Sequence, residues 1–386
     1  MRIGFDAKRA YQNGTGLGHY SRTLIHSLAN TFPKIEYYLF APKLTGRFNS
    51  GLYPNVQTIT PTHFPYNLLK AAWRSSGVKK ELETLQIDLY HGLSHEIPSG
   101  IQHTNIKSVV TIHDLIFERF PSQYNPIDIF IYRRKCKHAC KHADAVIAIS
   151  QQTKQDLINI YEIAEEKITV CYQSCDPSYT QTVPENEKEK IRQLYGLPNQ
   201  YFLTVGSIIE RKNLLTLCKA MLVLKEEKIN IPLLVIGKGD GYEKKVKQFV
   251  QDNVLQDLIL FLSDHPVAME HPSFKNSSHF PAIYQMAQAM IYPSTFEGFG
   301  IPVLEALCSR LPVITSNVSC MPEAGGDAAA YIQPFDEKDL AGKMKLISED
   351  LDVAASMKEK GWQHAQRFTA ERCATAVMNV YQKLML

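Results

Sequence analysis

The sequence has no long hydrophobic run and little net charge. No stretch of about 20 apolar residues occurs, so no membrane-spanning helix is predicted. Asp6 interrupts the opening MRIGFDAKRAY before an apolar core long enough for a signal peptide can form. The formal net charge of the 386 residues is +3, too small to indicate nucleic acid as a partner. We therefore expect a soluble, cytoplasmic protein that binds no nucleic acid.

Metal-binding patterns are also missing. None of the eight cysteines forms a CxxC pair. Cys136, His138, Cys140 and His142 alternate in RRKCKHACKHADAV, but on a helix the cysteines share one face and the histidines another. The four side chains therefore do not converge on a zinc ion, and reduced thiols are expected. No DxD motif ends a predicted strand either, so we expect no metal and no cofactor.

Short apolar strand patterns alternate with helical patterns through both halves of the chain, and 386 residues are too many for one ordinary domain. This alternation predicts an α/β fold of two Rossmann-like, doubly wound parallel-sheet domains facing a cleft. The polar, turn-rich DPSYTQTVPENEKEK is typical of a linker. We predict domains over residues 1–180 and 198–368, with a C-terminal helix over 369–386 that packs back on the first domain.

The stretch STFEGFGIPVLEALCSRLP places Glu297 and Glu305 on either side of a glycine-rich turn. The strand pattern AQAMIYPS precedes this turn, and a helical pattern from about 301 to 309 follows it. Ligand sites in parallel sheets form at such strand–turn–helix units, and the N–H groups at a helix start favour an anion. The two carboxylates would accept hydrogen bonds from sugar or ribose hydroxyls. The alternative is a capped surface helix with two solvated glutamates.

Two further loops of the second half carry polar groups directly after a strand pattern. VGSIIERKNLLTL places Ser207, Arg211 and Lys212 between a strand and a helix, with Asn213 as the predicted N-cap. A guanidinium beside an ammonium suits a diphosphate, although adjacent cations are also common on solvated loops. The next strand ends in the glycine turn GKGDGYE, which begins at Gly237. All three loops point phosphate- and hydroxyl-binding groups at one edge of the sheet.

In the first half, NGTGLGHYSRTL places Gly14, Gly16 and Gly18 between a strand and a helix. The spacing is G-x-G-x-G, and no acidic residue ends the second strand, so NAD binding is disfavoured. A close approach of this backbone to a phosphate remains open beside a purely structural turn. His113 and Asp114 end the strand KSVVTIHD, where ligands bind in such sheets. The alternative is that Asp114 caps a helix and His113 is satisfied internally.

As a whole, the chain resembles the family-4 retaining glycosyltransferases of the GT-B fold nearly from end to end. The resemblance rests on TIHD, AIS followed by QQTKQDLI, GSIIERKN, the E-x(7)-E pair inside PSTFEGFGIPVLEA, and LPVITSNVSCMPEAGGDAA. It implies transfer of a sugar from a nucleotide-sugar to an acceptor, with retention of the anomeric configuration. The second domain would hold the donor and the first domain the acceptor.

The resemblance also implies roles for individual residues. Glu297 would contact hydroxyls of the transferred sugar, and Glu305 the ribose diol. Arg211 and Lys212 would hold the diphosphate and stabilise the charge of the leaving group. His113 would lie beside the sugar near the anomeric carbon. The remaining donor contacts implied are Gly16, Ser207, Gly237, Phe299, Gly300 and Ile301.

The predicted reaction is metal-independent transfer of a hexose to a saccharide or lipid-linked saccharide in surface polysaccharide assembly. GDP-mannose is the predicted donor, on similarity to bacterial mannosyltransferases, and UDP-sugars are the alternative. Two features depart from the family pattern. Thr15-Gly16 stands where two glycines are frequent, and DHPVAMEHPSFKNSSHFPAIY reads as containing an inserted loop, residues 264–280, near the nucleotide base.

The segment FPYNLLKAAWRSSGVKK supports a further hypothesis, peripheral contact with the inner face of the membrane. An apolar face with a basic flank suits an anionic bilayer surface, although an ordinary amphipathic helix packed on the sheet gives the same pattern. The face would comprise Tyr66, Leu69 and Trp73 beside Lys70, Arg74, Lys79 and Lys80.

Other functions fit parts of the same pattern. A sugar-nucleotide epimerase or a phosphorylase of the GT-B fold would share the donor-binding loops. A catalytically silent sugar-nucleotide-binding or scaffolding protein is the alternative from another class. Such a protein has no need to keep His113, Arg211, Lys212, Glu297 and Glu305 together, so we favour the transferase.

Overall fold

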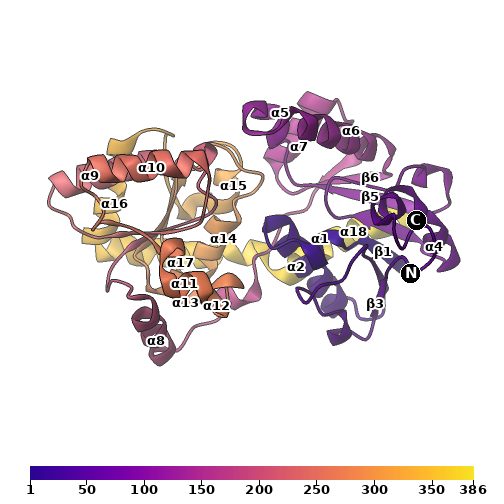
Figure 1. The fold of residues 1–386 in the computed structure, drawn as a ribbon, viewed down its shortest axis with the longest axis horizontal. Helices are drawn as coiled ribbons and strands as arrows, with labels where there is room; N and C mark the ends of the chain where they lie inside the picture. The colour runs from indigo at the N-terminus through magenta and orange to yellow at the C-terminus, as the bar shows by residue number, and fades with distance from the viewer. The chain divides into compact units, whose positions relative to one another are not determined.

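The computed structural model describes residues 1–386. The backbone forms two units, each with a parallel sheet and a buried core of its own (Figure 1). Unit 1 comprises residues 1–175 and 368–386, and unit 2 comprises residues 176–367. Two parallel sheets with helical connections confirm the predicted α/β fold class.

Unit 1 contains a 7-stranded parallel sheet in the order β3-β2-β1-β4-β5-β6-β7. The order reverses between β1 and β4, and ligands bind outside the carboxyl ends of the strands at such a reversal. The strands are β1 (Arg2–Asp6), β2 (Glu36–Phe40), β3 (Val56–Ile59), β4 (Leu89–Gly92), β5 (Lys107–Ile112), β6 (Ala145–Ala148) and β7 (Ile168–Val170). The helices are α1 (Lys8–Gln12), α2 (Gly16–Thr31), α3 (Lys70–Ala72), α4 (Lys79–Thr84), α5 (Ile116–Arg119), α6 (Pro126–His142), α7 (Gln151–Tyr161) and α18 (Ala370–Met385).

Unit 2 contains a 6-stranded parallel sheet in the order β10-β9-β8-β11-β12-β13, which reverses between β8 and β11. The strands are β8 (Phe202–Val205), β9 (Leu233–Ile236), β10 (Ile259–Phe261), β11 (Ala289–Tyr292), β12 (Val313–Ser316) and β13 (Ala330–Ile332). The helices are α8 (Glu185–Tyr195), α9 (Leu214–Glu226), α10 (Gly241–Asp252), α11 (Pro266–Glu270), α12 (Pro272–Lys275), α13 (Phe280–Met286), α14 (Ile301–Cys308), α15 (Met321–Gly325), α16 (Glu337–Glu349) and α17 (Leu351–Ala365).

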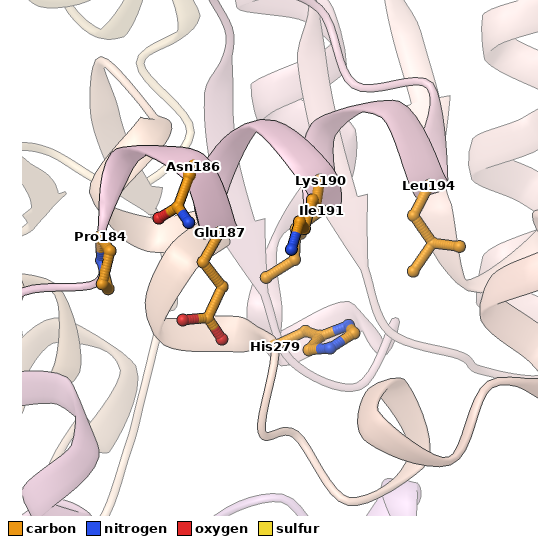
Figure 2. Close-up of a pocket in the computed structure, with 7 residues that line it drawn as sticks. All are labelled: Pro184, Asn186, Glu187, Lys190, Ile191, Leu194 and His279. Carbon is orange, nitrogen blue, oxygen red and sulfur yellow. The ribbon is translucent and has the colours of Figure 1, made fainter.

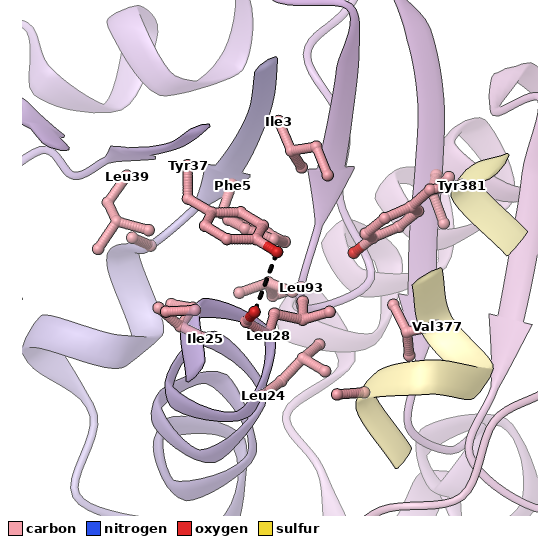
Figure 3. Packing of buried hydrophobic residues seen from close by; sticks show 14 of the residues in the cluster. Ile3, Phe5, Leu24, Ile25, Leu28, Tyr37, Leu39, Leu93, Val377 and Tyr381 are labelled. Carbon is pink, nitrogen blue, oxygen red and sulfur yellow. Dashed lines mark hydrogen bonds between the residues drawn. The ribbon is translucent and has the colours of Figure 1, made fainter. Parts of the chain in front are cut away.

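The core of unit 1 joins the start of the chain to its end (Figure 3). The rings of Phe5 and Tyr37 stack across β1 and β2 with centroids 5.9 Å apart. The Tyr37 hydroxyl donates to the Leu28 carbonyl oxygen at 3.1 Å, which fixes α2 on the sheet. Helix α18 lies beside α2 (Figure 1) and contributes Val377 and Tyr381 to this core. The last helix of the chain is therefore part of the first unit.

The prediction that residues 64–80 present Tyr66, Leu69 and Trp73 as one exposed apolar face is wrong. Trp73 is fully buried, and its indole N–H donates to Glu81 at 2.9 Å. Arg74 is almost buried as well, because its guanidinium pairs with both Asp6 and Glu96. The exposed apolar side chains lie earlier in the segment, at Phe64, Leu68 and Leu69. Membrane contact stays a prediction, and no helix of the structure has the length and apolar character needed to cross a bilayer.

The segment 264–280 forms α11 and α12, where the sequence predicts only a loop. Its prolines, Pro266 and Pro272, begin these helices, where a missing N–H costs nothing. The segment is held against α8 by Tyr195, whose hydroxyl lies 2.9 Å from Nδ1 of His279 and whose ring meets those of His271 and Phe274 edge-on.

Candidate functional site

The residues predicted to bind the donor lie where the strand order of unit 2 reverses. Arg211 and Lys212 lie in the single turn that follows β8, and Glu297 lies in the loop between β11 and α14. The two loops are bonded together, because the Thr295 N–H donates to the Arg211 carbonyl oxygen at 2.8 Å. The topology therefore brings together three residues that are distant in the sequence.

The carboxylate of Glu297 is the centre of a buried ion cluster. Its Oε1 lies 2.9 Å from Nη1 of Arg211 and 2.5 Å from Nζ of Lys212. The hydroxyls of Tyr292 and Ser294 donate to the same oxygen at 3.0 and 2.6 Å. Glu297 is only 8% exposed, so the alternative of a solvated surface glutamate is wrong.

The charges in this cluster stabilise one another. Burial raises the pKa of Glu297, but the charges of Lys212 and Arg211 outweigh burial and bring the pKa to about 2. Burial lowers the pKa of Lys212, and the Glu297 charge opposes that shift. With all three groups ionised, the cluster carries two positive charges and one negative charge. The net positive charge favours an anionic ligand at this edge of the sheet.

Hydrogen bonds from side chains to the backbone stabilise the loops around the cluster. A guanidinium nitrogen of Arg211 donates to the Phe296 carbonyl oxygen. Asn213 occupies the N-cap position of α9, as predicted, but its side chain makes no capping hydrogen bond. Its backbone is left-handed, with φ 58°, and its amide donates to the Pro293 carbonyl oxygen at 3.2 Å. Asn213 therefore ties the two loops together instead.

Glu305 occupies the second turn of α14, which begins at Ile301 as the sequence predicts. Its Oε2 accepts a hydrogen bond from the hydroxyl of Tyr284, on α13, at 2.8 Å. Burial raises the pKa of Glu305 to about 7, and the Tyr284 bond only partly opposes that shift. The group therefore titrates near neutral pH, and hydroxyl donors from a ligand would favour its ionised form.

The other predicted donor contacts lie around the same loops. A Cβ on Gly237 would stand 1.9 Å from a carbonyl oxygen of the loop after β8, so only glycine fits there. Gly300 has φ 97° and precedes the first residue of α14, Ile301. Ser207 is exposed, whereas Phe299 is buried.

His113 lies at the carboxyl end of β5 in unit 1 and is buried. Its Nε2–H donates to the Leu93 carbonyl oxygen at 2.9 Å, and its ring meets that of Tyr20 edge-on at 4.6 Å. Burial, helped by the neighbouring His95, lowers the pKa of His113 to about 3. The ring is therefore neutral at pH 7, and Nδ1 is its hydrogen-bond acceptor. Asp114 accepts from the Ile116 N–H at 3.0 Å, but the N-cap of α5 is Leu115, one residue after the position that the structural alternative gives it.

The first glycine loop contains the start of α2. A Cβ on Gly18 would stand 2.0 Å from the Asn13 carbonyl oxygen, whereas a Cβ on Gly16 would meet nothing within 4 Å. Gly18 is thus needed for packing, and the backbone at Gly16 is open to a ligand. The Thr15 N–H is not open, because it donates to the Asn13 side chain at 2.7 Å.

Sequence reasoning missed a second group of polar residues in unit 1. Lys8 and Arg9 directly follow β1, and Ser94 and His95 follow β4, its neighbour across the reversal in strand order. The signal was present in AKR after RIGFD and in SH after LYHG. It could be found only by asking which strand ends lie side by side.

Two other features lie apart from the predicted site residues. A cavity of about 400 Å³ lies between α8 and His279, and side chains of α8, among them Glu187 and Ile191, line it (Figure 2). None of the predicted donor-binding residues lines this cavity. No group of three or more His, Cys, Asp or Glu side chains is arranged to hold a metal ion.

Comparison with known families identifies the chain. Residues 186–364 match the family described as glycosyl transferases group 1, and residues 14–179 match glycosyltransferase family 4. The chain belongs to these glycosyltransferases. The glycosyltransferase is 27% identical over 301 residues to O-antigen chain mannosyltransferase B of Escherichia coli, an alignment covering 77% of this chain and 74% of the relative. It is 30% identical over 240 residues to O-antigen chain mannosyltransferase RfbU of Salmonella typhimurium, covering 62% and 60%.

Solved structures share the fold of this glycosyltransferase over its whole length. A glycosyltransferase from Rickettsia africae superposes with a TM-score of 0.74 at 18% identity, covering 100% of this chain and 98% of the other. Sucrose-phosphate synthase from Thermosynechococcus elongatus gives a TM-score of 0.74 at 20% identity, covering 100% and 99%. Anabaena HepE, solved with UDP and glucose, gives 0.72 at 17% identity, covering 99% of each chain. The fold is GT-B.

Proposed function

We propose that this glycosyltransferase transfers mannose from GDP-mannose, with retention, to a saccharide or lipid-linked saccharide acceptor in surface polysaccharide assembly. The observation that carries the proposal is the buried cluster of Arg211, Lys212 and Glu297 where the strand order of unit 2 reverses. Glu305 follows it on the adjoining helix. Charged and hydroxyl-binding groups thus meet at one edge of the sheet of unit 2.

Arg211 and Lys212 would bind the diphosphate of the donor. Only one carboxylate balances their two charges, and both are nearly buried, where an electrostatic contact is stronger than in water. When the glycosidic bond to the diphosphate breaks, negative charge grows on the leaving oxygen. Cations already held in place by Glu297 stabilise that charge without reorganising, which is usually the largest catalytic contribution of this kind. In this proposal they take the part that a metal ion plays elsewhere.

Glu297 would hold the transferred sugar while it holds the cations. All four side-chain contacts described above reach Oε1, so Oε2 is the oxygen that would accept a sugar hydroxyl. A carboxylate with a pKa of about 2 that is locked in ion pairs is a weak base and a weak nucleophile. The proposed reaction therefore forms no covalent sugar–Glu297 intermediate. The acceptor attacks the face that the leaving group departs from.

Glu305 would bind the ribose of the nucleotide. Its carboxylate already accepts one hydroxyl, that of Tyr284, and a diol would supply two more donors. His113, which is neutral, would offer Nδ1 to a sugar hydroxyl without adding charge near a developing oxocarbenium ion. The choice of mannose rests on the two relatives named as O-antigen chain mannosyltransferases.

The first test is a thermal-shift panel of GDP, GDP-mannose, UDP and UDP-glucose. A ligand that binds only the folded state raises the melting temperature by mass action. We expect GDP and GDP-mannose to stabilise the wild type and to lose most of that effect in Arg211→Ala and Glu305→Ala. Glu187→Gln, on α8, is the control and should respond like the wild type.

The other functions make different predictions for this panel and for a turnover assay with the same nucleotides. No shift with any nucleotide at saturating concentration would overturn the proposal. Binding without turnover of any acceptor would favour the silent scaffold, and release of UDP without an acceptor would favour the epimerase. If uridine nucleotides bind and guanosine nucleotides do not, the proposed donor changes to a UDP-sugar, and the proposed transferase function remains. The anomeric configuration of the product, read by NMR, tests retention.

A further inference from the structure

Two of the three buried polar atoms of unit 1 that lack a hydrogen-bond partner in the protein follow strands β1 and β4. They are Nε of Arg9 and the hydroxyl oxygen of Ser94, whose residue is only 4% exposed. Leaving a buried polar atom unpaired costs about 1–3 kcal/mol, so each such atom in a folded protein needs an explanation. Arg9 follows β1 and Ser94 follows β4, adjacent strands at the reversal in strand order. Both atoms therefore lie at the edge where doubly wound sheets bind ligands.

His95 adds a third donor beside them. Its backbone is held in the left-handed region, with φ 62°, by a bond from its N–H to the Thr111 carbonyl oxygen at 3.0 Å. Its Nε2 accepts the His113 N–H at 3.1 Å, and the two rings stack 5.4 Å apart at 7°. Because Nε2 is an acceptor, the proton of the neutral ring is on Nδ1, which no protein group accepts. Such strained residues persist where the surrounding structure holds them and cluster at functional sites.

The charges at this edge are also unbalanced. Arg74 pairs with both Asp6 and Glu96, and Lys135 also pairs with Glu96 at 3.0 Å. No carboxylate lies within ion-pair distance of Lys8 or Arg9. Asp114, at the end of β5, is the third acidic group here, and its charge acts on His113. Four cations thus stand against three anions, and neither of the two that follow β1 forms an ion pair.

We propose that Arg9, Ser94 and His95 form a subsite for an anionic group, a phosphate or a carboxylate, carried by the acceptor. Lys8 supplies a second positive charge. The inference rests on the proposed transferase function and names the class of its acceptor. An oxyanion has several lone pairs, and Arg9 Nε, Ser94 Oγ and His95 Nδ1 each have an unused donor to offer it.

The subsite differs from the predicted contact of His113. His113 uses its Nε2–H on Leu93, so it presents an acceptor, which suits a sugar hydroxyl and repels an anion. His95 presents a donor through the opposite tautomer. Burial, and then the charge of Arg9, lower the pKa of His95 to about 4, so the ring is neutral at physiological pH. The stacked pair thus separates a hydroxyl-binding position from an anion-binding position.

The experiment measures binding by isothermal titration calorimetry with the donor site filled by saturating GDP, or by UDP if that is the nucleotide bound. The probes are mannose 1-phosphate, methyl glucuronide and methyl mannoside. The wild type should bind at least one charged probe ten-fold or more tightly than methyl mannoside. A preference between the first two probes identifies the phosphate or the carboxylate as the natural group.

The variants separate this subsite from the fold and from the donor site. Arg9→Gln should weaken binding of the charged probe at least ten-fold and leave methyl mannoside unchanged. Lys107→Gln, an exposed cation at the opposite end of β5, is the matched control and should bind like the wild type. Ser94→Ala should weaken the charged probe about three-fold while raising the melting temperature, because it removes an unpaired buried hydroxyl. If Ser94 has only a structural role, Ser94→Ala should not change the affinity for the charged probe.

Three outcomes would overturn the inference. The first is equal affinity of the wild type for charged and neutral probes, and the second is no binding of the charged probes to the wild type. The third is weaker binding of the nucleotide to Arg9→Gln, which would assign Arg9 to the donor diphosphate. Failure of the transferase function is a separate result, because it would show as no thermal shift with any nucleotide in the absence of these probes.

Discussion

At the scale of single residues, the two glutamates of the E-x(7)-E pair have opposite electrostatics. Glu297 is ionised by two buried cations, with a pKa of about 2, whereas burial of Glu305 beside a phenol raises its pKa to about 7. Their spacing in the sequence gives no hint of this difference. It arises because Arg211 and Lys212 reach one carboxylate and only Tyr284 reaches the other.

The raised pKa of Glu305 predicts how stability depends on pH. Between its unfolded value near 4.5 and its folded value near 7, the folded state binds more protons, so stability falls as the pH rises through this window. Glu305→Gln removes a buried negative charge that lowers the free energy of unfolding above this window. We expect this variant to be more stable than the wild type by about 1–2 kcal/mol at pH 8 and equally stable near pH 4.5. Urea unfolding at the two pH values measures the difference.

Glu297→Gln is the matched control with the opposite sign. The folded pKa of Glu297 is lowered, so its contribution is present above pH 4.5 and lost as the pH falls toward 2. Removing its charge leaves two buried cations unbalanced and should cost about 3–5 kcal/mol at pH 7. If both variants shifted stability in the same direction at pH 8, the assigned electrostatics would be wrong.

At the scale of elements, the start of α2 shows two glycines with different roles. Gly18 touches the backbone of Asn13, whereas Gly16 faces open space. Gly18→Ala should therefore lower the melting temperature, at a cost of about 1–3 kcal/mol, because a methyl group is forced into a packed contact. Gly16→Ala should leave the melting temperature within a degree or two of the wild type while weakening the proposed donor phosphate contact. Thermal unfolding with and without the nucleotide separates the two effects, and equal loss of stability in both variants would contradict the assignment.

Much of the element structure could be predicted from the sequence. The run AQAMIYPS and the turn at Pro302 gave β11 and the start of α14 correctly, because apolar runs and first-turn prolines are local signals. The segment around Trp73 could not be predicted in the same way. Its apolar and basic residues fit a surface helix, but Trp73 is buried in an apolar core of unit 1, and Arg74 pairs with Asp6 and Glu96. A pattern of hydrophobicity does not say which long-range partner a charged residue meets.

At the scale of the whole molecule, the last helix belongs to the first unit. Val377 and Tyr381 of α18 are buried in the core that β1 and α2 form, and the Tyr381 hydroxyl lies 2.5 Å from Nδ1 of His91. Burying one such side chain contributes about 1.5–3 kcal/mol, so several of them amount to much of the 5–15 kcal/mol that stabilises a typical domain. The end of the chain therefore decides whether its beginning stays folded.

Truncation after residue 369 should unfold unit 1 and leave unit 2 folded. Hydrogen exchange read by mass spectrometry should show lost protection in β1, β4 and β5 and retained protection in β8, β9 and β11. Removal of Met385 and Leu386 alone, which are exposed, is the control and should change neither unit. Retained protection of β1 in the longer truncation would show that α18 is dispensable.

The sequence by itself determined the two parallel sheets, the order of their elements and the loops that carry His113, Arg211, Lys212, Glu297 and Glu305. These features follow from apolar runs, glycine turns and strand ends, which depend on neighbours a few residues away. Only the tertiary structure decided that Glu297 holds both cations, that Trp73 and Arg74 face inward, and that Arg9, Ser94 and His95 are left with unused donors. The reason is physical: strand order places side by side residues that are far apart in the chain, and burial then fixes which charges and donors find a partner.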